Sequence, residues 1–192
     1  PETTAARKRP ATGPSANHAR SDTASALTYA ASYADFLALT ASDVVAVTGN
    51  SMGWYSTLAC AGALSADQGC RLVNTMGQLM QDSLIGGQLV YPITDDTWQP
   101  DTTQRAAVIQ LMTEIAQKAG HKLALSIDLG GMLVLAGNEA GLADFMKQAK
   151  PQGQFPLRLH NHAAFHTVLQ SPLRARPKTA LTLRCLHSPK SP

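Results

Sequence analysis

The chain has 192 residues, of which 44% are hydrophobic, 15% charged and 5% aromatic, and its formal net charge is +3. This length suits one ordinary domain. No apolar run approaches the length of a membrane helix, so we expect neither a membrane-spanning segment nor a membrane partner.

The positive charge belongs to the two ends of the sequence. Residues 1–20 carry +3 and residues 174–192 carry +5. Subtracting the +8 of the two ends from the total of +3 leaves −5 for residues 21–173. An acidic middle without interleaved basic and aromatic residues excludes nucleic acid as a partner.

The N-terminal segment predicts irregular structure followed by a helix. Residues 1–23 are rich in Pro, Ala, Ser, Thr and Arg without apolar periodicity, which is typical of a disordered arm. From Leu27, apolar residues recur at three- and four-residue spacing through Ala31, Ala34 and Leu37 or Ala38. This spacing predicts an amphipathic helix.

A strand, a tight turn and a helix are predicted in succession after that helix. The β-branched run 44–47 is typical of a buried parallel strand. Gly49-Asn50-Ser51-Met52-Gly53 follows, and residues 54–63 are small and apolar enough to form a packed helix. Ser65-Ala66-Asp67-Gln68 then has the pattern of a capping box, which predicts the start of a second helix.

The following part alternates strands and helices in the order β-α-β-β-α-β. The predicted segments are a strand at 88–91, a helix around 108–119, strands at 123–127 and 132–136, a helix at 142–149 and a strand at 155–159. The middle strands are separated by a turn at Gly130-Gly131. This order is that of a ferredoxin-like subdomain.

Residues 49–53 match Gly-x-Ser-x-Gly, the pattern of a nucleophile elbow. The elbow needs a strand that feeds a sharp turn, glycines where a Cβ would clash, and a helix whose first amides point at the serine. The sequence predicts all three, so we expect Ser51 to be a nucleophile. The amide of Met52 is then placed to donate one hydrogen bond to an oxyanion.

A serine nucleophile needs a base, and four histidines lie between the two ends of the chain: His121, His160, His162 and His166. His166 follows the last predicted strand, where the chain can return to the elbow. His160-x-His162 invites a metal-site interpretation, but no acidic or Cys ligand lies nearby. We therefore expect His160 and His162 to be strand-end and loop residues, and we predict no metal.

The stretches 49–56, 59–64 and 71–73 resemble the malonyl-CoA:acyl carrier protein transacylases and the related acyltransferase domains of polyketide synthases. Those proteins have Gly-His-Ser-Leu-Gly-Glu-Tyr-Ser, then an Ala-Gly helix, then Arg-Leu-Val, and their inserted ferredoxin-like subdomain ends in Phe-His-Thr or Ser-His-Cys. Asn138-Glu139-Ala140 and Ala164-Phe165-His166-Thr167 stand where the family has its corresponding residues. The resemblance covers roughly residues 25–172.

The resemblance implies an α/β fold with an incomplete parallel-sheet acyltransferase core that contains the elbow. On this basis we expect a disordered arm at 1–23, the partial core at 24–85 and 161–172, the ferredoxin-like subdomain at 86–160, and an irregular basic tail at 173–192.

Three cysteines without Cys-x-x-Cys spacing leave an odd thiol, which favours a reducing, cytoplasmic location.

The resemblance also implies ping-pong acyl transfer by a Ser-His dyad. Ser51 would attack an acyl-CoA thioester while His166 takes its proton, and the phosphopantetheine thiol of an acyl carrier protein would then collect the acyl group. No cofactor is implied, because coenzyme A enters as part of the substrate. The partners would be acyl-CoA and acyl carrier protein, in either fatty acid or polyketide biosynthesis.

Three positions depart from the family pattern. Asn50 replaces the histidine before the nucleophile and Trp54 replaces the glutamate after the second glycine, which suggests a reshaped substrate pocket. The family's Arg-Gly pair, which holds the malonyl carboxylate, is Met76-Gly77 here. Because a thioether cannot replace a bidentate guanidinium, we expect weakened selection for malonyl and a preference for uncharged acyl groups, or else an acyl-thioesterase.

Three other interpretations are open at this point. An α/β-hydrolase esterase would use Ser51, His166 and an acid such as Asp128 or Asp144, but the compact subdomain between serine and histidine argues against it. A patatin-like Ser-Asp lipase would need Asp-Gly, whereas Asp128 precedes Leu129.

An inactive truncated remnant is the third interpretation. No Gly-Gln-Gly loop precedes Leu27, and residues 172–192 lack periodicity. One or both ends would then be truncated or out of frame, and the incomplete sheet would expose strand edges and make a stable monomer doubtful.

Overall fold

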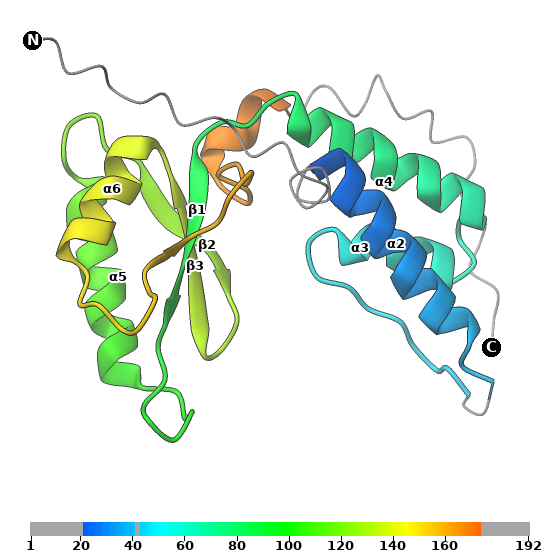
Figure 1. Ribbon diagram of the computed structural model, residues 1–192, viewed down its shortest axis with the longest axis horizontal. Coiled ribbons are helices and arrows are strands. Elements are labelled where there is room, and N and C mark those ends of the chain that lie inside the picture. The colour runs from blue at the N-terminus through cyan, green and yellow to red at the C-terminus, as the bar shows by residue number, and fades with distance from the viewer. Residues whose placement is uncertain (1–20, 41–42, 174–192) are drawn as a thin grey trace, which may run out of the picture.

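The computed structural model describes residues 21–40 and 43–173 (Figure 1). Its helices and strands, in chain order, are α2 (Ser21–Leu37), α3 (Gly53–Cys60), α4 (Ala66–Gln81), β1 (Gly87–Pro92), α5 (Thr102–Ala116), β2 (Leu123–Asp128), β3 (Met132–Gly137), α6 (Glu139–Gln148), β4 (Leu157–Arg158) and the 3-10 helix η1 (Val168–Leu173). From β1 onward the order agrees with the β-α-β-β-α-β order predicted from the sequence.

The four strands form one sheet in the order β2-β3-β1-β4, and every neighbouring pair is antiparallel. The β2–β3 turn is closed by the Leu129 N–H, which donates to the Met132 carbonyl at 2.9 Å. Gly130 has a φ of +81° in this turn, a conformation that glycine adopts without steric cost. The register of β2 against β3 shifts between Leu125 and Ile127.

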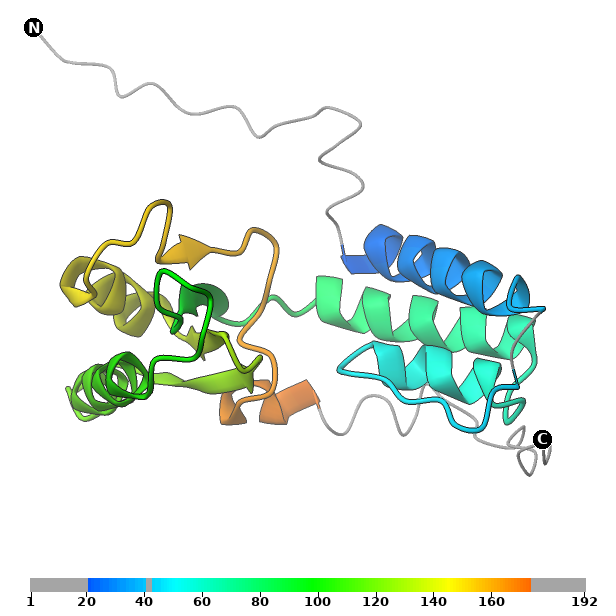
Figure 2. The same ribbon diagram turned by 90° about the horizontal axis from the view of Figure 1, so that it is seen from below.

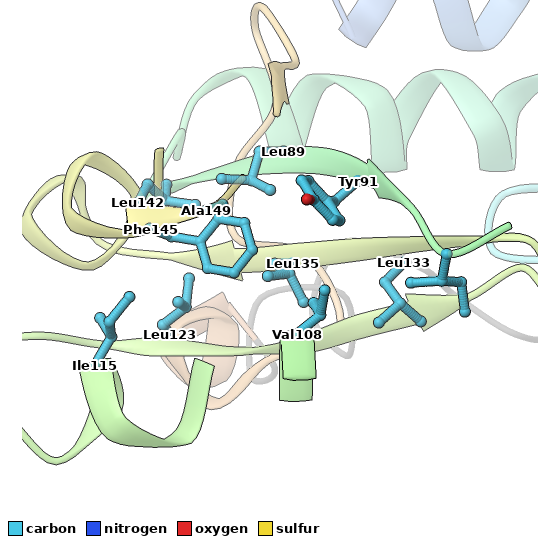
Figure 3. Packing of buried hydrophobic residues seen from close by; sticks show 11 residues of the cluster. Leu89, Tyr91, Val108, Ile115, Leu123, Leu133, Leu135, Leu142, Phe145 and Ala149 are labelled. Carbon is cyan, nitrogen blue, oxygen red and sulfur yellow. The ribbon is translucent and has the colours of Figure 1, made fainter. Parts of the chain in front are cut away.

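Helices α5 and α6 pack on one face of the sheet and bury its main hydrophobic core (Figure 3). The buried members are Leu89, Tyr91, Ile93, Val108, Ile115, Leu123, Leu133, Leu135, Leu142, Phe145 and Ala149. The rings of Tyr91 and Phe145 meet edge to face at 5.8 Å. This core positions the opposite face of the sheet, which carries part of the site described below.

The other three α-helices, α2, α3 and α4, form a separate group beside the sheet (Figures 1 and 2). Tyr29 of α2 is 4% exposed, and its hydroxyl donates to the Ala66 carbonyl at 2.8 Å. A Cβ on Gly69 of α4 would collide with the Tyr29 ring, so this glycine allows the two helices to pack closely. The predicted capping box is confirmed, with both reciprocal hydrogen bonds between Ser65 and Gln68.

The buried face of α2 differs from the predicted one. Leu27 and Leu37 are 50% and 61% exposed, whereas Tyr29 is buried and Tyr33 and Phe36 are half-buried. The aromatic rings stack along the helix, and Tyr29 and Tyr33 pack in a cluster with Ala59 of α3 and Val73 of α4. The helix also begins at Ser21, inside the stretch predicted to be a disordered arm.

The prediction of a buried parallel strand at 44–47 is wrong. Residues 43–49 are in no strand, and Val45 is 86% exposed. A strand needs neighbouring backbone to pair with, and the sheet formed by the described residues is antiparallel and lies elsewhere in the fold. The predicted α/β core at 24–85 is therefore helical in the part of the chain that the structure describes.

The last strand is shorter than predicted. Only Leu157 and Arg158 pair, with β1, and Leu157 is 37% exposed, so the expected burial alternation over 155–159 does not hold. Pro156 lacks the N–H that a longer ladder would need. The remaining predictions for the arm and the basic tail fall on residues 1–20 and 174–192, outside the described residues.

None of the helices described is long and apolar enough to cross a bilayer. Cys60 and Cys70 are free thiols, and Cys185 lies outside the described residues.

Candidate active site

Ser51 lies in a tight turn immediately before α3. Its φ is 52°, in the left-handed region, and the turn is closed by the Gly53 N–H, which donates to the Asn50 carbonyl at 2.8 Å. A Cβ on Gly49 would collide with the backbone of Gly53, whereas a Cβ on Gly53 would meet nothing within 4 Å. The first glycine of the pentapeptide is therefore required by close backbone approach, and the second is not.

His166 lies in the turn between β4 and η1. Two hydrogen bonds stabilise this turn. The Ala164 N–H donates to the Ile85 carbonyl at 2.8 Å, and the Thr167 hydroxyl donates to the Ala164 carbonyl at 2.7 Å. His166 has a φ of 58°, so it too occupies the left-handed region.

The Oγ of Ser51 lies 2.9 Å from Nε2 of His166. Non-glycine residues in the left-handed region cost about 1–3 kcal/mol each and persist only where surrounding contacts fix them. Both partners of this contact adopt that conformation. An unprotonated Nε2 at this distance can accept the hydroxyl proton, which makes the oxygen a nucleophile.

A cavity of about 330 Å³ opens beside this pair. It is lined by Ala24, Ser25, Thr28, Ser51, Met52, Tyr55, Met76, Gly77, Met80, Gln88, Ile127, His162, Phe165 and His166. Residues of α2, α3, α4 and the sheet therefore contribute to one space. Among the described residues that line it there is no Lys, Arg, Asp or Glu, so an apolar, uncharged group fits this cavity best.

The predicted site residues are not all brought together. Met76 lines the cavity and is 8% exposed, and Met52 is the N-cap residue of α3 directly after Ser51. No hydrogen bond to the Met52 N–H is found within the described ranges, which leaves that amide free to donate. Asn50 and Trp54, which were predicted to shape the substrate pocket, are exposed and do not line the cavity.

Sequence reasoning missed several cavity residues. His162, expected to be a plain loop residue, lines the cavity and contacts Gln88, and burial lowers the pKa of its imidazole. The aromatic side chains of Tyr55 and Phe165 also line the cavity, and burial raises the pKa of the Tyr55 hydroxyl. One available signal was Gln88, a polar residue in an otherwise apolar strand.

The acids considered for a hydrolase triad are engaged elsewhere. Asp128 binds Arg105 at 2.8 Å, and this hydrogen bond lowers the pKa of its carboxyl. Asp144 binds Lys118 at 2.6 Å with the same effect on its pKa. In the described part of the chain neither acid contacts His166, and no group of three or more His, Cys, Asp or Glu side chains could hold a metal ion.

By sequence alone, no family model matches the chain and no curated protein is significantly similar to it. Solved structures do match, and they include acyl carrier protein transacylases. The malonyl-CoA:acyl carrier protein transacylase of Coxiella burnetii superposes with a TM-score of 0.74 at 22% identity, covering 94% of this chain and 56% of its own. The S-malonyltransferase of Burkholderia pseudomallei gives 0.73 at 24% identity, covering 94% and 58%.

A third match is a malonyl-transacylase in complex with a type II polyketide synthase acyl carrier protein, with a TM-score of 0.72 at 22% identity and coverage of 94% and 58%. Together with the α/β architecture, these matches show that the chain has an acyltransferase fold. More particularly, it has the fold of the malonyl-CoA:acyl carrier protein transacylases and spans a little over half the length of the structures that it matches.

Proposed function

We propose that the chain carries the nucleophile and base of an acyltransferase that moves an acyl group from coenzyme A to an acyl carrier protein. The observation that supports this most directly is the 2.9 Å contact between Ser51 Oγ and His166 Nε2 at the mouth of an apolar cavity. The acyltransferase fold and the elbow-like turn at Ser51 are consistent with it, as is a ferredoxin-like assignment for the unit from β1 to β4.

In the first half-reaction Ser51 Oγ attacks the thioester carbonyl carbon and His166 Nε2 takes the hydroxyl proton. The tetrahedral oxyanion would accept a hydrogen bond from the Met52 amide at the start of α3. Collapse breaks the C–S bond, and the proton on His166 passes to the departing coenzyme A thiolate. The products are free coenzyme A and an ester on Ser51.

The second half-reaction runs the same steps in reverse with another thiol. His166 takes the proton of the carrier protein's phosphopantetheine thiol, whose sulfur attacks the Ser51 ester. The new thioester leaves on the carrier, and the proton returns to Ser51 Oγ. One solved structure with this fold is a malonyl-transacylase bound to its acyl carrier protein, which supports the choice of acceptor.

We propose uncharged acyl groups as the substrates. Met76 stands in the cavity wall, where the family pattern has an arginine, and Met80, Ile127 and Phe165 extend the apolar lining. A malonyl carboxylate would be desolvated there without a cation, which costs several kcal/mol for an unpaired charge. Acetyl and longer saturated acyl groups carry no such cost.

The test is transfer of a radiolabelled acyl group from acetyl-CoA to holo acyl carrier protein. We expect labelled carrier protein with the parent chain and none with Ser51→Ala. Failure of the parent chain to label the carrier, while a full-length transacylase does so, would contradict the proposal and favour the inactive remnant.

A thioesterase is the second candidate, because both Ser51 and His166 are exposed. Water that reaches the Ser51 ester would hydrolyse it in place of transfer to a thiol. Release of coenzyme A from acetyl-CoA without carrier protein, at a rate equal to that with carrier, would favour this candidate.

A further inference from the structure

Gln88 is a buried polar side chain on the face of the sheet opposite α5 and α6. It is 3% exposed, although its neighbours in β1, Leu89 and Tyr91, belong to the hydrophobic core. A buried amide needs partners, because each unsatisfied polar group costs about 1–3 kcal/mol. Gln88 has two such partners, from different segments of the chain.

Three side chains form one hydrogen-bonded chain. Gln88 Nε2 lies 2.8 Å from Ser126 Oγ, Ser126 Oγ lies 2.9 Å from the Phe165 carbonyl oxygen, and Gln88 Oε1 lies 2.9 Å from His162 Nδ1. A carbonyl only accepts, so the single hydroxyl proton of Ser126 goes to Phe165. Ser126 must then accept from the Gln88 amide.

The remaining direction follows from the same count. Because the Gln88 NH₂ faces Ser126, its carbonyl oxygen faces His162, and Nδ1 of His162 must carry the proton. Burial lowers the pKa of His162, which favours the neutral ring, and the neutral ring with a proton on Nδ1 is sufficient for this bond. Each of the three hydrogen bonds therefore has one donor and one acceptor.

This chain holds the segment that carries His166 at two points. One is the side chain of His162, and the other is the carbonyl of Phe165, in the peptide bond that immediately precedes His166. The N–Cα bond of His166 starts in that peptide plane, so holding the plane orients this bond, about which His166 has a φ of 58°. Within the described residues no partner is found for the Nδ1 atom of His166, so its ring is not held from that side.

We infer that Gln88, Ser126 and His162 are positioning residues, which hold the His166 backbone so that Nε2 meets Ser51 Oγ. This inference rests on the proposed Ser51–His166 dyad. It gives a function to a polar chain centred on the buried Gln88, in which none of the three members contacts the reacting oxygen. A misplacement of about 1 Å at a catalytic group can cost about 100-fold in rate.

The experiment measures phosphonylation of Ser51 by an alkyl fluorophosphonate, in which Ser51 Oγ displaces fluoride with no acyl donor or carrier protein needed. The variants are Ser126→Ala, Ser126→Thr, Gln88→Leu and His162→Ala, and the matched control is Thr113→Ala, which removes an exposed hydroxyl from α5. The maximum labelling rate, the half-saturating probe concentration and the thermal midpoint are measured for each.

We expect Ser126→Ala and Gln88→Leu to lower the maximum rate at least tenfold at an unchanged half-saturating concentration, and Ser126→Thr to restore it. His162→Ala, which alters a side chain of the loop after β4, should lower the rate at least threefold. Variants that label at the parent rate would overturn the inference while leaving the dyad intact. A parent chain that does not label at all would overturn the proposed function itself.

Discussion

Ser51 and His166 lie 115 positions apart in the sequence, yet Ser51 Oγ and His166 Nε2 are 2.9 Å apart, and both residues adopt left-handed backbone conformations. The hydroxyl comes from the helical group and the imidazole from the turn after the sheet. The contact therefore depends on how these two parts of the chain meet, and the cavity between them is lined by both.

The base should matter nearly as much as the nucleophile. His166→Ala removes the group that accepts the Ser51 proton, and general base catalysis typically contributes about 10²–10⁴-fold. We expect the rate of Ser51 acylation by acetyl-CoA to decrease by a factor in that range. The rate is measured by mass spectrometry of samples quenched at successive times. His160→Ala, which changes an exposed histidine six positions away, is the control and should acylate at the parent rate.

The two glycines of the pentapeptide should respond differently to alanine. Gly49→Ala places a methyl group against the Gly53 backbone, so we expect loss of Ser51 labelling and a loss in the free energy of unfolding of about 2 kcal/mol. Gly53→Ala, at the start of α3 with open space around it, should retain labelling and stability. Equal tolerance of both substitutions in thermal unfolding would show that the turn is not held as described.

Donor selection should be changed by one residue of the cavity. Met76→Arg supplies a cation to a malonyl carboxylate, and a hydrogen bond to a charged group is worth about 1.5–3 kcal/mol, or roughly 10- to 150-fold. We expect the ratio of acylation rates from malonyl-CoA and acetyl-CoA to rise at least tenfold. Met76→Leu, which keeps the wall apolar, should leave the ratio unchanged. A strong malonyl preference in the parent chain would rule out the assignment of uncharged substrates.

Packing of the helical group should fail in alkali. Burial raises the pKa of Tyr29 to about 12, from about 10 in an unfolded chain, with smaller contributions from the nearby Tyr33 and Cys70. The folded state therefore holds this proton more tightly, and the stabilisation is fully present below pH 10 and lost as the pH rises towards 12. Tyr29→Phe should lose part of the stability at neutral pH but show a flatter alkaline decline in urea unfolding. An unchanged decline would contradict this account.

Local patterns predicted much of the fold, and the failures have physical causes. The capping box at Ser65 and the β-α-β-β-α-β order depend on short-range spacing, which a sequence displays directly. The run 44–47 has strand propensity, but a strand forms only where another strand pairs with it, and none of the described strands does so. The buried face of α2 was missed because Tyr29 packs against glycine and alanine positions on other helices.

For the site, Ser51, His166 and Met76 could be predicted because a recognisable motif surrounds each of them. His162 could not, because its place in the cavity depends on a partner in β1, 74 positions earlier in the sequence. Asn50 and Trp54 were assigned to the substrate pocket because they replace residues of the family pattern, and neither lines the cavity.

Intact-mass measurement of the chain after incubation with acetyl-CoA tests the central claim most directly. We predict a mass increase of one acetyl group that maps to the peptide containing Ser51 and is absent in Ser51→Ala. No adduct on the parent chain, or an adduct that persists in Ser51→Ala, would contradict the assignment of Ser51 as the acyl-accepting nucleophile.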